Sequence, residues 1–112
     1  MSCLFDSLSR FLLINSFQLR QHICNYLEND PSLYDEIKAS DWIFWEYNTN
    51  LNNYVRNMRQ HHIWGGGIEI KSFCNIYNVQ VNVHLQYKTI SFYPNSFIDK
   101  IININYTGNH FM

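Results

Sequence analysis

The sequence predicts an α+β domain in which helices come first and strands come last. Apolar residues recur at helical spacing as far as Tyr77, and from Val79 onward apolar and polar residues alternate. This order is typical of helices packed on a small, mostly antiparallel sheet. With 112 residues, of which 46% are hydrophobic, we expect one globular domain that spans residues 1–112.

Composition argues against several classes of protein. The net charge is −1 and no basic block occurs, so we expect no nucleic-acid partner. No apolar run reaches membrane-spanning length and no basic segment precedes an apolar one at the start, so we expect neither a membrane partner nor a signal peptide. Three cysteines without Cys-x-x-Cys spacing indicate a reducing compartment, which we take to be the cytoplasm, and no disulfide framework. We expect a monomer.

Adjacent histidines, His61 and His62, could suggest a metal site. Neighbours in sequence point apart on a helix, and no cysteine or aspartate clusters near this pair. A solvated polar pair is therefore the favoured interpretation, and we expect neither metal nor cofactor.

The first predicted helix begins at Cys3 and extends to the break at Asn15-Ser16. Its apolar stripe consists of Leu4, Phe5, Leu8, Phe11 and Leu12. Ser2 is a plausible N-cap, which puts Cys3 in the first turn, where unpaired amides favour the thiolate form. The alternative is a small buried hydrophobic residue, which is the commoner role of a lone cysteine.

A second helix follows from Ser16 to the stop at Asn29-Asp30-Pro31, with Cys24 on its apolar face. We expect a short third helix over residues 31–38 and a polar helix over residues 48–60. Between them, three large aromatic residues either pack beneath the helices or form an exposed recognition patch, and packing is favoured. These aromatic residues are Trp42, Phe44 and Trp45.

Three consecutive glycines, Gly65 to Gly67, separate Trp64 from an amphipathic run that predicts another helix. Glu69 falls in the first turn of that helix, where a carboxylate complements the helix dipole. One interpretation is a helix-entry loop with Trp64 as a core plug. The other is a platform for an extended peptide that lacks side chains, because glycine allows close approach of another backbone.

The end of the chain predicts a series of strands. Residues 79–85 alternate strictly, residues 87–93 and 98–106 form two more strands, and a turn at Thr107-Gly108-Asn109 leads into a last strand from His110. We expect consecutive hairpins.

Segments far apart in the sequence carry a resemblance when they are taken together. They are Cys3-Leu4-Phe5, Leu19-Arg20, Trp64-Gly65-Gly66 with Glu69-Ile70, and Gly108-Asn109-His110-Phe111. The set resembles the ovarian-tumour (OTU) family of cysteine proteases, which act on ubiquitin conjugates. That family shows an Asp-Gly-x-Cys-Leu-Phe helix start, a Leu-Arg helix, a Trp-Gly-Gly-x-x-Glu-Leu segment and a terminal His-Tyr/Phe strand. The resemblance implies a papain-like OTU fold.

The resemblance also implies a deubiquitinase that hydrolyses isopeptide bonds after the C-terminal Gly-Gly of ubiquitin or of a ubiquitin-like protein. Cys3 would be the nucleophile, His110 its general base, and the backbone amides of Ser2 and Cys3 the oxyanion donors. The tail groove would be lined by Trp64, Gly65 and Gly66. For His110 the alternative is a surface histidine in a turn.

Two departures from the family pattern lower the expected rate. The Asp-Gly before the cysteine is missing, because the sequence begins Met1-Ser2-Cys3, and Met112 stands where the family has Asp or Asn. Asn109 is adjacent to His110, so along a strand it points to the opposite face. We therefore expect a slow enzyme, of minimal size such as a virus could encode. The alternatives are an inactive ubiquitin-binding module and an unrelated α+β protein.

Overall fold

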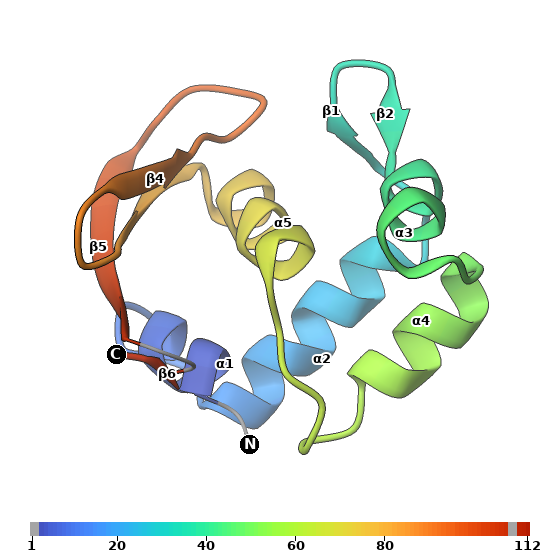
Figure 1. Cartoon of the computed structure of the whole chain (residues 1–112), viewed down its shortest axis with the longest axis horizontal. Coiled ribbons are helices and arrows are strands. Elements are labelled where there is room, and N and C mark those ends of the chain that lie inside the picture. Colours follow the sequence, from blue (N-terminus) through green and yellow to red (C-terminus); the bar gives the residue numbers. More distant parts are fainter. Residues whose placement is uncertain (1–2, 108–109) are drawn as a thin grey trace.

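The computed structural model describes residues 3–107 and 110–112. Within them the helices are α1 (Cys3–Ser9), α2 (Ser16–Leu27), α3 (Ala39–Tyr47), α4 (Leu51–Met58) and α5 (Gly67–Tyr77). The strands are β1 (Ser32–Tyr34), β2 (Ile37–Lys38), β3 (Val79–His84), β4 (Thr89–Phe92), β5 (Lys100–Thr107) and β6 (His110–Phe111). Helix α5 packs on β3 and β4 on one side and on α2 on the other, so it lies between the larger sheet and the remaining helices (Figure 1). None of the described helices is long and apolar enough to cross a membrane.

The predicted α+β class is confirmed, but the strands do not all form consecutive hairpins. The larger sheet has the order β4-β3-β5-β6, in which β3 and β5 are parallel and the other two pairings are antiparallel. After β4 the chain crosses to the other edge of β3. The amide of Asp99 donates a 2.6 Å hydrogen bond to the carbonyl oxygen of Asn78, which holds the start of β5 beside the start of β3. The two strands therefore run in the same direction.

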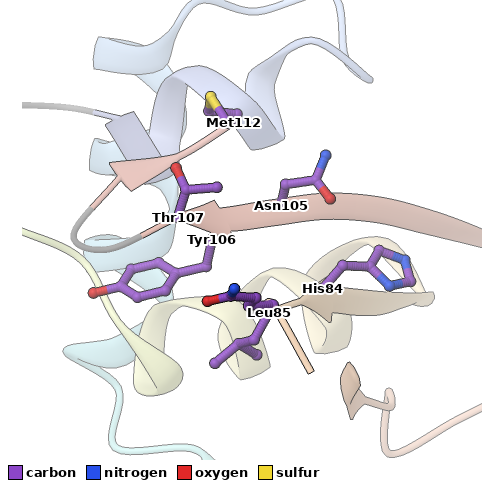
Figure 2. A pocket seen from close by; sticks show the side chains of 7 residues that line it. His84, Leu85, Asn105, Tyr106, Thr107 and Met112 are labelled. Carbon is purple, nitrogen blue, oxygen red and sulfur yellow. The ribbon is translucent and has the colours of Figure 1, made fainter. Parts of the chain in front are cut away.

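Alternation along the strands separates a buried face from a polar face, as the sequence predicts. The alternate residues Val79, Val81 and Val83 are buried, and Ile102 and Ile104 are their buried neighbours on β5. The residues between them face away from α5. On β5, Asn105 and Thr107 lie on one side of the strand and Tyr106 on the other (Figure 2).

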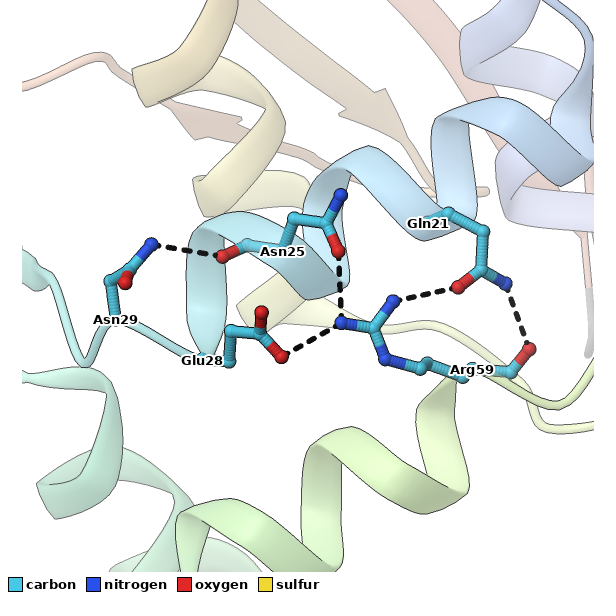
Figure 3. A network of polar contacts seen from close by, with 5 residues as sticks. All are labelled: Gln21, Asn25, Glu28, Asn29 and Arg59. Carbon is cyan, nitrogen blue, oxygen red and sulfur yellow. Dashed lines mark hydrogen bonds and ion pairs between the residues drawn. The ribbon is translucent and has the colours of Figure 1, made fainter.

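The helical layer is held partly by a polar network between α2 and the end of α4. The Arg59 guanidinium donates hydrogen bonds to Gln21 Oε1 at 2.7 Å and to Asn25 Oδ1 at 2.9 Å, and it forms an ion pair with Glu28 at 2.9 Å (Figure 3). Both partners of the ion pair are partly exposed, so it contributes less than about 1 kcal/mol.

Two helix predictions are wrong in extent or type. Helix α1 ends at Ser9 instead of reaching Asn15, because the chain then tightens into turns in which the Phe11 and Leu12 amides donate to carbonyl oxygens three residues back. Asn15 is the N-cap of α2: its side chain accepts a 2.8 Å bond from the Gln18 amide, and the Gln18 side chain accepts a bond from the Asn15 amide. Residues 32–38 form the β1–β2 hairpin and no helix, because Asp35 has a left-handed backbone with φ of 41° that reverses the chain.

The expectation that the aromatic cluster packs inward holds for one member only. Trp42 is partly buried against the core, whereas Phe44 is 60% and Trp45 66% exposed. Helix α3 packs on α4 and β2 along one side, where Ala39 and Ile43 are buried. Phe44 and Trp45 lie on its other faces and stay largely exposed.

Candidate active site

Cys3 and His110, the two residues expected to carry out the chemistry, lie on elements that contact each other. Cys3 is the first residue of α1 and is partly exposed, and His110 is the first residue of β6 and is exposed. Helix and strand pack together although they stand at opposite ends of the chain (Figure 1). A thiol and an imidazole on touching elements are the groups that cysteine-based nucleophilic catalysis needs. Ser2, the other expected oxyanion donor, lies outside the described residues.

The glycine segment packs directly on the first turn of α1. A Cβ atom at Gly65 would lie 2.7 Å from Leu4 Cδ2 and 3.0 Å from Phe5 Cε2, and both of these side chains are buried. A residue with a side chain would not fit without moving the core, so glycine is required here for close approach. Helix entry is confirmed, because α5 begins at Gly67, but Trp64 is no core plug since it is 48% exposed.

A groove of about 300 Å³ runs along this segment. One part of its lining is Trp64 to Gly67, and the other is apolar: Ile70, Val83, Leu85, Ile90, Phe92, Tyr106 and Phe111. All three residues expected to line a tail groove are therefore brought together. Phe111 follows His110 directly, so the groove reaches the strand that carries the histidine. A Cβ atom at Gly66 would have Tyr47 Oη at 3.9 Å as its nearest neighbour, so this part of the wall is open.

Glu69 fixes the turn that carries the glycines. It lies in the first turn of α5, as predicted, and it is fully buried. Its Oε1 accepts a 2.7 Å hydrogen bond from the Gly66 amide, and its Oε2 accepts a 2.6 Å bond from the Tyr54 hydroxyl on α4. Burial raises the pKa of Glu69 to about 7, and the bonds from Tyr54 and Gly66 oppose that rise. The carboxyl group therefore ties the groove wall to the helical layer.

Stability is expected to fall as the pH rises through the range in which Glu69 ionises. The unfolded chain loses this proton near the ordinary pKa of 4.5, whereas the folded chain holds it to about pH 7. Folding is therefore favoured below that range, and the free energy of unfolding should drop by about 2–3 kcal/mol between about pH 5 and about pH 8. In Glu69→Gln the amide oxygen can accept from the Gly66 amide and the amide NH2 can donate to the Tyr54 hydroxyl, so both contacts remain without a charge and this drop should disappear. Urea unfolding at the two pH values measures it, with the exposed Glu46→Gln as control, and equal drops in all three proteins would contradict the assignment.

Arg20 holds the chain segment that leads to the glycines in place through hydrogen bonds to its backbone. Its side chain is buried, with the guanidinium 4.2 Å from the centre of the Phe5 ring. It donates hydrogen bonds to the carbonyl oxygens of Met58 at 2.7 Å and of His61 at 3.1 Å. One side chain thus connects α1, α4 and the loop before Trp64. The sequence places Arg20 in the Leu-Arg motif but predicts no structural role for it. The clue to that role is an arginine beside Leu19 on the apolar face of α2.

The three cysteines differ sharply in accessibility. Cys24 and Cys74 are fully buried, as their helical positions predict. Burial raises the pKa of the Cys24 thiol to about 12 and that of the Cys74 thiol to about 11, so neither is a nucleophile near neutral pH. Cys3 is the one cysteine that solvent reaches.

The His61–His62 pair lies in the loop between α4 and α5 that leads to Trp64. The two rings meet edge to face with centres 5.6 Å apart, and both residues are exposed. Across residues 3–107 and 110–112, no group of three or more His, Cys, Asp or Glu side chains is arranged to hold a metal ion.

The fold and the candidate site are those of an OTU-type α+β domain. A partly exposed cysteine begins one helix, glycines form one wall of a groove, and the last strand begins with a histidine. The chain belongs to the OTU-like cysteine protease family, whose sequence profile matches residues 2–111. The predicted resemblance is thereby confirmed. Among curated proteins, none matches the sequence.

Solved structures show the same fold. An OTU domain in complex with ubiquitin superimposes with a TM-score of 0.77 at 23% identity, over 98% of this chain and 61% of that one. The viral OTU domain protease of Dera Ghazi Khan virus gives 0.71 at 15% identity, over 98% and 71%. A ubiquitin-bound OTU deubiquitinase from Wolbachia pipientis wMel gives 0.69 at 16% identity, over 98% and 86%. The chain thus spans only 61% of the length of the first of these domains.

Proposed function

We propose that this chain is a deubiquitinating cysteine protease that hydrolyses isopeptide bonds after the C-terminal Gly-Gly of ubiquitin. The observation that carries the proposal is the packing of Gly65 on Leu4 and Phe5, because it sets the glycine-walled groove beside the helix that begins at Cys3. Family membership supports the class of reaction, and the ubiquitin-bound relatives support the substrate.

The proposed reaction divides one hydrolysis into two steps. His110 removes the thiol proton of Cys3, and the thiolate attacks the carbonyl carbon of the last glycine. The negative charge then develops on the carbonyl oxygen, where the Cys3 backbone amide is the donor that the described residues supply; each such donor is worth about 3 kcal/mol. His110 protonates the departing lysine amine, which leaves a thioester. Water, deprotonated by the same histidine, hydrolyses the thioester and regenerates the thiol.

The groove accounts for the choice of tail. One wall is formed by the glycines, and the remaining lining is apolar up to Phe111. A tail that ends in two residues without side chains fits between such walls, whereas a bulkier tail would clash with Trp64 or with the strands. A substrate held in this position has its last carbonyl beside the helix start that carries Cys3. We further propose that the enzyme works in the reducing environment of the cytoplasm, because its cysteines are free.

One observation favours a second candidate, an OTU-like module that binds ubiquitin without turning it over. Met112 is opposite Asn105 on the β5–β6 ribbon and stands where the family has a side chain that orients the histidine. A thioether cannot hold an imidazole as a carboxylate or amide does. Such a module would keep the groove and bind the tail.

Ubiquitin that carries a propargyl group in place of its last glycine carboxylate separates the candidates. The reagent is expected to form a covalent adduct with the wild-type chain, and peptide mass spectrometry should locate it at Cys3. Cys3→Ala should give no adduct. His62→Ala is the matched control for His110→Ala, since both histidines are exposed, and only His110→Ala should slow the labelling.

Each outcome of this labelling has a defined meaning. An adduct at Cys24 or Cys74 would contradict the assignment of the nucleophile. No adduct, together with calorimetric binding of ubiquitin, would establish the binding module. Neither adduct nor binding would remove ubiquitin as the partner.

A further inference from the structure

We propose that Asn105 on β5 orients the His110 ring, the task that the family assigns to the residue at position 112. The inference rests on the proposed function, because a ring orienter matters only where His110 acts as a base. Its support, however, is the register of the β5–β6 ribbon and the chemistry of the side chains on one of its faces.

The register puts Asn105 and His110 on the same face. Thr107 pairs with His110, and Tyr106 pairs with Phe111. One step further, Asn105 and Met112 exchange two backbone hydrogen bonds, of 2.9 Å and 2.7 Å. Directly paired residues of an antiparallel ribbon point to the same side, and that side alternates along the strand. Asn105 is therefore a diagonal neighbour of His110 and the direct partner of Met112.

The Asn105 side chain borders open space on this face of the ribbon. Asn105, Thr107 and Met112 line a pocket of about 500 Å³ beside the end of β5 (Figure 2). Diagonal neighbours of this kind are about 7–8 Å apart at their Cα atoms, which longer side chains can bridge. An amide at position 105 can therefore approach the ring from the same side as a residue at position 112 would.

Covalent geometry favours Asn105 over the closer Thr107. The amide Oδ1 of asparagine and the Nδ1 of histidine are both three bonds from their Cα atoms, so the two atoms can reach the same distance from the strands. The threonine hydroxyl is one bond shorter and stays near the backbone. Met112 has no atom that accepts a strong hydrogen bond. Of the neighbours on this face, Asn105 is the side chain with an acceptor at the level of the ring.

Other polar side chains of the same face are already engaged with one another. Asn103 Oδ1 lies 2.8 Å from His84 Nε2 and also accepts a bond from Asn82, and His84 Nδ1 lies 2.8 Å from the Thr89 hydroxyl. The Asn105 amide has no such bond within the described part of the chain. It is therefore available to accept a hydrogen bond from Nδ1 of His110, which would leave Nε2 to take the proton of Cys3.

The test measures turnover of diubiquitin and the tautomer of His110 in the same variants. Asn105→Ala should lower kcat by at least about tenfold, as part of the roughly 10²–10⁴ that a positioned base supplies, with KM changed less than about twofold. Asn105→Asp should keep the activity. The double variant Asn105→Ala with Met112→Asn should recover it, because the second change returns an amide to the paired position.

Two matched variants give the controls. Asn103→Ala removes an asparagine that lies on the same face of β5 but does not neighbour β6. Thr107→Val removes the hydroxyl of the other polar side chain beside His110. Neither change should alter kcat. The nitrogen shifts of the His110 ring, measured by NMR, should show the Nδ1–H tautomer in the wild type and lose it in Asn105→Ala.

The tautomer reports on the inference even where turnover is absent, so failure of the proposed function and failure of the orienter are distinguishable. An unchanged kcat and tautomer in Asn105→Ala would overturn the inference. A loss of kcat of the same size in Thr107→Val or Asn103→Ala would also overturn it.

Discussion

Replacing Cys3 by alanine is expected to abolish cleavage of diubiquitin and to leave the affinity for ubiquitin unchanged. The variant lacks the proposed nucleophile, and no other thiol can replace it because Cys24 and Cys74 are buried. The groove is unaffected, since its lining does not include Cys3. His110→Ala should lower kcat by roughly 10²–10⁴-fold, because the base is lost while the thiol remains.

Two measurements check this prediction. Single-turnover cleavage of diubiquitin gives the chemical step, and calorimetry on Cys3→Ala gives the dissociation constant for ubiquitin. His62→Ala serves as the control for a general effect of removing an exposed histidine. Cleavage by Cys3→Ala within about tenfold of wild type, well inside the range that a lost nucleophile costs, would show that another group performs the attack.

Arg20→Ala is expected to destabilise the helical layer strongly. Truncation removes a buried side chain, leaves the carbonyl oxygens of Met58 and His61 without this donor, and opens space against Phe5. Hydrogen bonds to a charged donor and lost buried volume each cost about 2–3 kcal/mol, so the free energy of unfolding should drop by about 3–5 kcal/mol. Urea denaturation measures it.

Arg59→Ala is the matched control, because it removes the other arginine that joins α2 to the end of α4. Its ion pair with Glu28 is solvent-exposed, and its other partners, Gln21 and Asn25, can bond to water instead (Figure 3). The expected loss is about 1 kcal/mol or less. Similar losses in the two variants would show that Arg20 does not hold the loop before Trp64. A folded Arg20→Ala chain should also lose ubiquitin affinity, because that loop carries one wall of the groove.

Part of the candidate site is visible in the sequence because motifs of fixed chemistry mark it. Cys3 at a helix start and the glycines before Glu69 each need a particular residue type, so they are visible in the sequence. The β1–β2 hairpin was not, because its reversal depends on a left-handed Asp35, which a non-glycine residue adopts only in its tertiary context. The parallel pairing of β3 with β5 was hidden for a similar reason: alternation specifies faces and leaves strand order open.

The role inferred for Asn105 shows a further limit of sequence reasoning. Asparagine alternates with isoleucine along this strand, and nothing in that pattern separates Asn103 from Asn105. The difference arises from the neighbours, since Asn103 lies beside His84 whereas Asn105 pairs with Met112. Pairing across strands is a long-range property, and a single sequence does not contain it.

The contact between α1 and β6 has a consequence for the order of folding. It joins the two ends of the described chain, and closing so long a loop costs more conformational entropy than any local contact in this fold. Contacts of this kind form after the local helices and hairpins have reduced the entropy of the intervening chain. Cys3 and His110, the proposed nucleophile and base, should therefore meet in one of the last events of folding. A partly folded chain would carry an exposed thiol and a groove that lacks Phe111, so it would have no proteolytic activity.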